Sequence, residues 1–298
     1  MIFKDFQFKV FFSRLYDKVY EEDILSSAAQ VAFYFSFSLF PLLLFLITLF
    51  GMVLSSTDDL QGELFYYLRQ VMPYSAFHLV RTTIKEVTEN SSGGKLTIGF
   101  FIALWSASAG VDSIRIALNS VYSLIETRDW WKTKLLSLAF TVVIEILISI
   151  ALAIVFYGWK FVSFALTTFS LPVPAPFVLV LIQWAAVFIL LLIVFDLLYN
   201  YIPNHSPLKW YWVTPGAIVG IVLWLILSGG FRLYLHYFNS YDKTYGSLGA
   251  VIILMLWLYL TSLVILIGGL INCIFTEMSQ LEENIKNKKL TNEIRSEP

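Results

Sequence analysis

Residues Leu96–Trp131, LTIGFFIALWSASAGVDSIRIALNSVYSLIETRDWW, decide how the chain is interpreted. The stretch begins as an apolar membrane segment and becomes polar with no glycine or proline after Gly110. On one continuous helix, 100° per residue places a set of polar side chains within about 40° of one line. This set, called the polar stripe below, comprises Ser108, Asp112, Arg115, Asn119, Tyr122 and Glu126.

The polar stripe would extend roughly 27 Å, at about 1.5 Å per residue. Its membrane half cannot face lipid and needs water or protein partners. One interpretation is an ordinary amphipathic helix whose stripe pairs with neighbouring helices. The other is a transport path, because ionisable residues inside a membrane are a functional hypothesis by default.

The composition is that of a polytopic membrane protein. The 298 residues are 58% hydrophobic and 14% charged, whereas a soluble domain carries roughly 25% charged residues. A net charge of -1 gives no basic field for nucleic acid. With the single cysteine Cys273 and three widely separated histidines, the sequence has no metal-binding motif. We expect no metal and no cofactor.

The hydrophobic pattern predicts an all-α fold with six transmembrane helices in a domain at residues 24–276. Each predicted span is long enough to cross about 30 Å of hydrocarbon. The spans fall at about residues 31–54, 95–116, 135–157, 177–199, 210–232 and 247–273. Six crossings place both termini on one side, and the excess of lysine and arginine on that side predicts cytoplasmic termini.

Three segments outside the spans have their own patterns. Residues 1–23 predict an amphipathic helix, with Phe11, Leu15 and Val19 on its apolar face, that lies at the membrane interface or packs on the protein. Residues 60–90 predict two short helices that form an extracytoplasmic cap. Residues 277–298 predict a polar cytoplasmic tail that is partly disordered.

A lone carboxyl group lies near the middle of the third predicted span. Glu145 would cost roughly 2.5–3.5 kcal/mol at that depth if it were ionised. We therefore expect it to be neutral, or to pair with a polar residue such as Arg115 or Gln183. A proton-coupled site and a simple interhelical hydrogen bond both stay open.

Four stretches carry a family resemblance. They are AAQVAFYFSFSLFPLLLFL (28–46), WSASAGVDSIRIALNSVYSLIETRDWWKTKLLSL (105–138), YIPNHSPLKWYWVTPGAIVGIVLW (201–224) and YGSLGAVIILMLWLYLTSLVILIGGLIN (245–272). In this order they resemble the YihY/virulence factor BrkB family over about residues 24–275. The resemblance implies a six-span protein of the bacterial inner membrane, without an established activity.

The resemblance also marks individual positions, most of which have structural explanations such as helix shaping and capping. Those that match the recurrent pattern of the family are Pro41, Trp105, Ser108, Asn119, Tyr122, Glu126, Arg128, Pro203, Pro215, Gly216, Tyr245, Gly246, Trp257, Gly268 and Asn272. The family offers no catalytic residues to transfer.

Members of this family have been labelled as a ribonuclease that processes tRNA, and the sequence argues against that activity here. A metal-dependent nuclease needs clustered carboxylates or histidine and cysteine ligands to hold ions. The acidic runs outside the spans, at Asp58-Asp59 and Glu282-Glu283 for example, are typical of solvated surfaces. We therefore expect no enzyme and no nucleic-acid partner.

The sequence leads to one preferred function and one alternative. The preferred function is a transporter-like protein for a lipid or amphipathic solute, with membrane lipids as partners. Its candidate polar path is Ser108, Asp112, Arg115, Asn119, Tyr122, Glu126, Glu145 and Gln183. The alternative is a non-transporting scaffold or assembly factor of the cell envelope, and the sequence leaves open whether the protein is a homo-oligomer.

Overall fold

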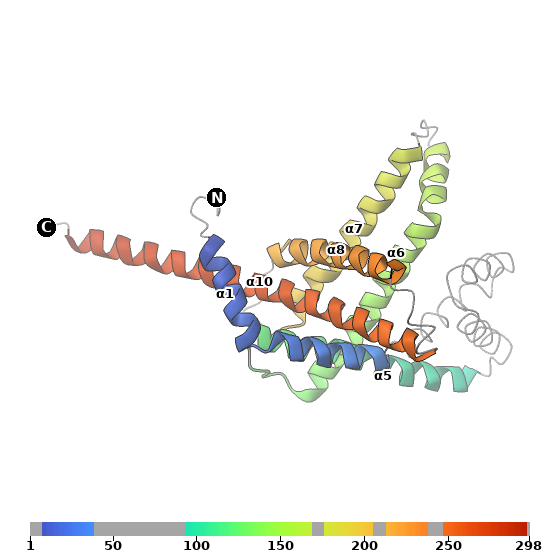
Figure 1. Ribbon diagram of the computed structural model, residues 1–298, viewed down its shortest axis with the longest axis horizontal. Helices are drawn as coiled ribbons and strands as arrows, with labels where there is room; N and C mark the ends of the chain where they lie inside the picture. The colour runs from blue at the N-terminus through green and yellow to red at the C-terminus, as the bar shows by residue number, and fades with distance from the viewer. Residues whose placement is uncertain (1–7, 39–92, 169–175, 205–212, 238–246, 297–298) are drawn as a thin grey trace. The chain divides into compact units, whose positions relative to one another are not determined.

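The computed structural model describes residues 8–38, 93–168, 176–204, 213–237 and 247–296. Within these ranges every regular element is an α-helix (Figure 1). The helices are α1 (Phe8–Glu21), α5 (Gly93–Val121), α6 (Trp130–Thr168), α7 (Pro176–Tyr201), α8 (Pro215–Tyr237) and α10 (Ser247–Ser296), with a further helical run at Ile24–Ser38. The predicted all-α class is confirmed for this part of the chain.

Five described helices are long and apolar enough to cross a membrane. Their crossing segments are Phe101–Val121, Trp130–Val155, Phe177–Tyr201, Pro215–Tyr234 and Val251–Gln280. They correspond to the second through sixth predicted spans.

The first predicted span and the cap are described only in part or not at all. Of residues 31–54, the structure describes those up to Ser38, at the end of a helical run that is too short to count as a crossing by itself. The cap helices predicted at 60–90 lie outside the described residues. The count of six spans and the cap therefore stay predictions.

The chain divides into two compact units. Unit 1 contains residues 1–33, 113–128 and 185–298, and unit 2 contains residues 34–112 and 129–184. The division passes through α5 between Asp112 and Ser113, so residues of the polar stripe belong to both units.

Within unit 1, α8 and α10 lie side by side and approach closely at glycines (Figure 1). A Cβ atom built at Gly216 would lie 2.0 Å from the carbonyl oxygen of Gly268, and one built at Gly268 would lie 2.2 Å from the hydroxyl oxygen of Tyr199. That hydroxyl donates a hydrogen bond of 2.8 Å to the carbonyl of Ile265 on α10. Small residues suit this contact, because helix association in a membrane depends on close van der Waals packing.

The substitution Gly268→Ala tests this contact. Overpacking a tight interface costs about 1–3 kcal/mol, so we expect a lower midpoint of thermal unfolding in detergent. Gly229→Ala is the matched control on α8, because a Cβ atom there meets nothing within 4 Å. That control should leave the midpoint unchanged or slightly raised, since alanine favours a helix over glycine by about 0.5–1 kcal/mol. Equal midpoints for Gly268→Ala and the wild type would contradict the proposed role of Gly268.

The N-terminal helix packs on the protein within unit 1. α1 contacts α10 (Figure 1), and the buried ring of Phe11 has its centroid 5.3 Å from that of Phe275. Glu277 on α10 forms ion pairs with Lys18 and with Arg14, the latter at 3.5 Å. The apolar face predicted for residues 1–23 is therefore used, at least at Phe11, for a contact with α10.

The C-terminal tail is helical. α10 continues without interruption to Ser296, so the prediction that residues 277–298 are partly disordered is wrong for the part that the structure describes. Glu282 lies four residues before Lys286. An acidic residue in this position relative to a basic one stabilises a helix, and the disorder prediction gave this spacing too little weight.

Candidate functional site

The polar stripe does not lie on one helix. α5 ends at Val121, and the residues from Leu124 to Thr127 have no regular structure before α6 begins at Trp130. Tyr122 and Glu126 therefore lie outside the helix on which the sequence placed them. The prediction of a continuous helix through Glu126 is wrong.

Ser123 causes the helix to end. Its φ of 51° is left-handed, its N–H donates to the carbonyl of Ser120 at 2.8 Å, and the N–H of Leu124 donates to the carbonyl of Asn119 at 2.7 Å. This pair of bonds is the Schellman motif, in which glycine usually occupies the left-handed position. A serine at this position gives no sequence signal for a helix end, which explains the incorrect prediction.

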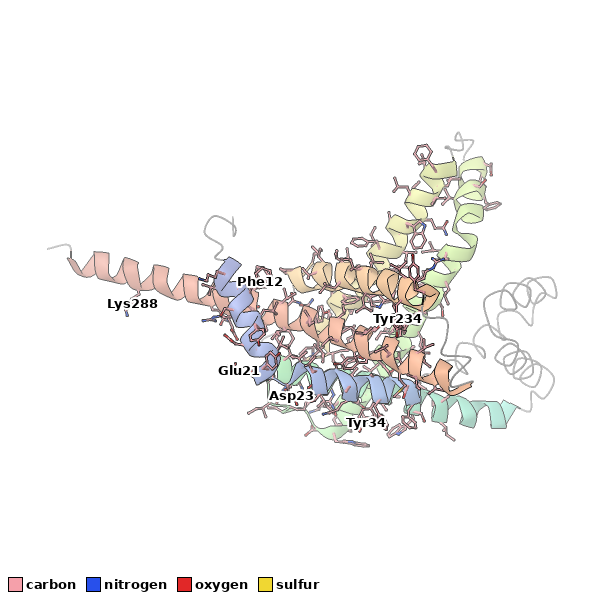
Figure 2. All side chains as sticks on the ribbon, viewed as in Figure 1. Phe12, Glu21, Asp23, Tyr34, Tyr234 and Lys288 are labelled. Atoms are coloured by element: carbon pink, nitrogen blue, oxygen red, sulfur yellow. The ribbon has the colours of Figure 1, made fainter. Side chains whose placement is uncertain are left out.

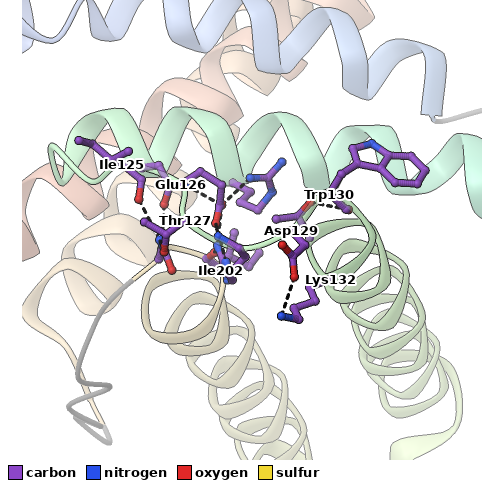
Figure 3. Close-up of polar contacts among 12 residues, drawn as sticks. Ile125, Glu126, Thr127, Asp129, Trp130, Lys132 and Ile202 are labelled. Atoms are coloured by element: carbon purple, nitrogen blue, oxygen red, sulfur yellow. Dashed lines mark hydrogen bonds and ion pairs between the residues drawn. The ribbon is translucent and has the colours of Figure 1, made fainter.

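Because the chain turns after α5, the carboxylate of Glu126 meets residues of α5 from outside the helix (Figure 3). Its Oε2 accepts hydrogen bonds from Arg115 Nη1 at 2.6 Å and from Asn119 Nδ2 at 3.1 Å. Arg128 donates three further hydrogen bonds to this carboxylate. Its Nε bonds to Oε1 and its Nη2 to Oε2, both at 2.8 Å, and its backbone N–H bonds to Oε1 at 3.1 Å. We call these four residues the Glu126 cluster.

The Glu126 cluster also joins the connection after α5 to the end of α7. Arg128 Nη2 donates to the carbonyl of Ile202 at 3.0 Å. The backbone N–H of Asn204 donates to Asn119 Oδ1 at 2.8 Å, and its side chain donates to the carbonyl of Ile125 at 2.8 Å. Both carboxylate oxygens of Glu126 thus accept hydrogen bonds from residues of unit 1. This is expected of a cluster whose role is to hold helix ends together.

The charges of the cluster stabilise ionised Glu126. The side chain of Arg128 is the main cause, and Arg115 adds to it; together they lower the pKa of Glu126 from its usual 4.5 to about 2. Because the pKa of Glu126 is lower in the folded than in the unfolded protein, Glu126 stabilises the fold fully at pH values above its unfolded-state pKa. This stabilisation is lost as the pH falls through the folded-state pKa. The relevant window is therefore from about pH 4.5 down to about 2.

The substitution Glu126→Gln tests this assignment. At neutral pH the variant should unfold at a lower temperature, because the guanidinium groups of Arg115 and Arg128 lose their carboxylate. A broken buried or half-buried charge pair costs about 3–5 kcal/mol at most. On acidification from pH 4.5 towards 2, the difference in unfolding midpoint from the wild type should shrink.

Asp129→Asn is the control for Glu126→Gln. Asp129 pairs with Lys132 at 2.7 Å, but more than half of each side chain is exposed (Figure 3). An exposed pair contributes about 0–1 kcal/mol, so this variant should follow the wild type throughout. A Glu126→Gln difference that is constant with pH would contradict the charge-based explanation.

The membrane half of the stripe meets α6 within unit 2. Lys134 Nζ donates to Ser108 Oγ at 2.6 Å and to Asp112 Oδ2 at 3.2 Å, and it lies 4.5 Å from the ring centroid of Trp105. Ser137 Oγ donates to the other carboxylate oxygen of Asp112 at 2.6 Å. Neither Lys134 nor Ser137 was among the residues predicted for the path. The spacing of Lys134, Ser137 and Glu145 on one helix could have identified both.

Within unit 2, Glu145 and Gln183 do not pair with each other. Gln183 Nε2 donates to the carbonyl of Val155 at 2.6 Å, and Arg115 bonds to Glu126. The carboxyl group of Glu145 is buried, and neither of its oxygens has a hydrogen-bond partner among the described residues. Of the two expected outcomes for Glu145, a pair with Gln183 is not formed, and a neutral carboxyl group stays a prediction.

A second buried polar cluster was not predicted. Asp196 Oδ1 accepts hydrogen bonds from the N–H and the hydroxyl of Thr214, both at 3.1 Å. Asn272 Nδ2 donates to the Thr214 hydroxyl at 3.1 Å, and Asn272 Oδ1 accepts from the N–H of Gly216 at 2.6 Å. These bonds satisfy backbone donors at the start of α8, which would otherwise be unpaired.

The described clusters differ in what they can do chemically. In the Glu126 cluster and around Asp196, hydrogen bonds join helix ends. Among the described residues, no three histidine, cysteine, aspartate or glutamate side chains come together so as to hold a metal ion. Glu145 differs from both clusters, because it is a titratable group inside a membrane-crossing helix with its hydrogen-bonding capacity unused by the described residues.

Comparisons with known proteins identify relatives over nearly the whole chain. The sequence profile of the family described as Virulence factor BrkB matches residues 15–293. A Bacillus subtilis protein named ribonuclease-like protein YfkH is 34% identical over 273 residues, which are 92% of this chain and 98% of that protein. A UPF0761 membrane protein of Idiomarina loihiensis is 26% identical over 76% of this chain and 75% of its own length. No solved structure matches the chain.

Proposed function

We propose that this chain, which belongs to the Virulence factor BrkB family, is a transporter-like protein that moves a lipid or another amphipathic solute across the bacterial inner membrane. A multi-pass membrane location follows from the five apolar helices and from relatives named as membrane proteins. The transport activity, the location in the inner membrane and the cytoplasmic placement of both termini are proposed.

The observation that carries the proposal is the buried carboxyl of Glu145. Ionised, it would cost roughly 2.5–3.5 kcal/mol near the centre of a crossing helix. Protonated, its polar atoms, which have no hydrogen-bond partner among the described residues, still cost about 1–3 kcal/mol. A side chain that is costly in either state suits a site that exchanges a proton or a polar ligand during a transport cycle.

A polar face on α6 connects Glu145 to Lys134, which pairs with Asp112 near the start of that helix. Lys134, Ser137, Thr141 and Glu145 recur at three- and four-residue steps, which is one face of a helix. Ser137 and Thr141 are 1% and 2% exposed, so this face is buried in protein and does not meet lipid. From Lys134 to Glu145 the face is about 16 Å long, at about 1.5 Å per residue.

The candidate path is therefore narrower than the sequence indicated. Ser108, Asp112 and Glu145 remain in it, and Lys134 and Ser137 are added because they bond to Asp112. Arg115, Asn119 and Glu126 are assigned to the Glu126 cluster, because the first two donate hydrogen bonds to the carboxylate of the third. The side chain of Tyr122 is hydrogen-bonded to Asn272, in the second polar cluster, and Gln183 bonds to the backbone of α6.

Reconstituted protein tests the proposal. In liposomes, movement of a labelled lipid and uptake driven by a proton gradient should exceed the values for empty liposomes. Glu145→Gln keeps the shape of the side chain but cannot release a proton, so it should lose most of the proton-driven uptake. Asp112→Asn should also reduce uptake, because Lys134 would lose its carboxylate partner.

Asp129→Asn is again the matched control, since it removes a carboxylate outside the crossing segments and should leave uptake unchanged. Equal uptake by the wild type and Glu145→Gln would remove Glu145 from the mechanism. Uptake equal to that of empty liposomes would reject transport of the solutes tried.

The helical extension of α10 favours one alternative, an envelope scaffold or assembly factor. The helix continues from Gln280, where its crossing segment ends, to Ser296. Such a charged helical arm is a suitable surface for a protein partner. Crosslinking in cells would distinguish the two functions, because a scaffold requires a stoichiometric partner and the transporter does not. A nuclease ranks last, and metal analysis with an RNA-cleavage assay tests it.

A further inference from the structure

The face of α1 that points away from α10 carries a row of aromatic side chains. Phe12, Tyr16 and Tyr20 follow one another at four-residue steps, which places them along one line of the helix. They are 60%, 65% and 63% exposed, respectively. The ring centroids of Tyr16 and Tyr20 are 4.9 Å apart, so the two side chains form a continuous aromatic surface. We call the three residues the aromatic row (Figure 2 labels Phe12, near the start of α1).

The opposite face of α1 fixes the helix to the membrane-crossing part of unit 1. Phe11 packs against Phe275, and Arg14 and Lys18 form ion pairs with Glu277. At 100° per residue, Phe11, Arg14 and Lys18 lie on the side away from the aromatic row. The orientation of α1 about its own axis is thus set by its contacts with α10.

The position of these contacts along α10 gives the depth of α1. Residues 247–276 contain no charged side chain, and Glu277 is the first. This run exceeds the roughly 20 apolar residues that a crossing segment needs, and the crossing segment of α10 ends by Gln280. The bilayer boundary therefore falls close to Glu277. Aromatic side chains with polar tips, together with lysines, are enriched at this boundary.

We propose that the aromatic row inserts into the boundary between lipid headgroups and acyl chains, and that α1 lies on the bilayer surface beside α10. Lys9 is exposed and shares the face of Tyr16 and Tyr20, at seven- and eleven-residue steps. Its charge complements anionic headgroups. Tyrosine suits this place because its ring is buried in the apolar layer while its hydroxyl reaches water and headgroups.

Site-directed labelling of the full-length protein tests the proposal. Cys273 is the only cysteine and is buried, so Cys273→Ser gives a background for single new cysteines at Phe12, Tyr16 and Tyr20. Each carries an environment-sensitive fluorophore in vesicles of phosphatidylethanolamine and phosphatidylglycerol. The matched control is Glu21→Cys, which is exposed on the same helix but off the row (Figure 2).

Labels on the aromatic row should lose fluorescence to a quencher attached near the top of the lipid acyl chain and should resist aqueous iodide. The label at Glu21 should show the reverse. Row labels that are quenched only by iodide would overturn the proposal. Row labels that are shielded in native membranes but exposed to iodide in vesicles would also overturn it, because a protein would then cover the row.

Discussion

The left-handed turn at Ser123 is the constraint on which the rest of unit 1 depends. It ends α5 and turns the chain so that Glu126 comes back to Arg115 and Asn119. Without this turn, the carboxylate would lie further along the same helix and could not collect five hydrogen bonds from three residues. The same reversal places Arg128 against the end of α7. The backbone conformation of Ser123 therefore brings residues predicted to follow one another along a single helix into the Glu126 cluster. This cluster connects the loop after α5 with α5 and with the end of α7.

Hydrophobic length and composition were enough to predict the all-α class and five of the crossing helices, because a bilayer fixes the length of an apolar segment. The helix end at Val121 could not be predicted, because its signal is a serine in a conformation that usually takes glycine. The partners of Asp112 were missed because Lys134 and Ser137 lie on another helix: their spacing with Glu145 marks a polar face of α6, but it does not say which residue that face meets. Glu145 was recognised as unusual, but Gln183, one of the partners suggested for it, bonds to the backbone of α6 instead, which no local sequence pattern indicates.

Several positions that match the family pattern lie at helix ends or at contacts between helices. The Glu126 cluster contains three of them, Asn119, Glu126 and Arg128. The contact between α10 and the start of α8 contains another three, Gly216, Gly268 and Asn272. In these places the backbone has unpaired groups or approaches another helix closely, so few side chains fit. This explains why such positions mark the architecture without revealing the activity. Glu145 lies outside the pattern, and its proposed role rests on its burial and on the lack of a hydrogen-bond partner in the described part of the chain.

The unbroken course of α10 has a mechanical consequence. Its hydrogen-bonded backbone connects the glycine contact at Gly268 with Ser296, and the portion after Gln280 is about 24 Å long at about 1.5 Å per residue. A rigid rod of this kind works as a lever: a tilt of a few degrees where it crosses the bilayer displaces its far end by an ångström or more. Glu277, held by α1, sits close to the pivot, so the anchored N-terminal helix would resist that swing.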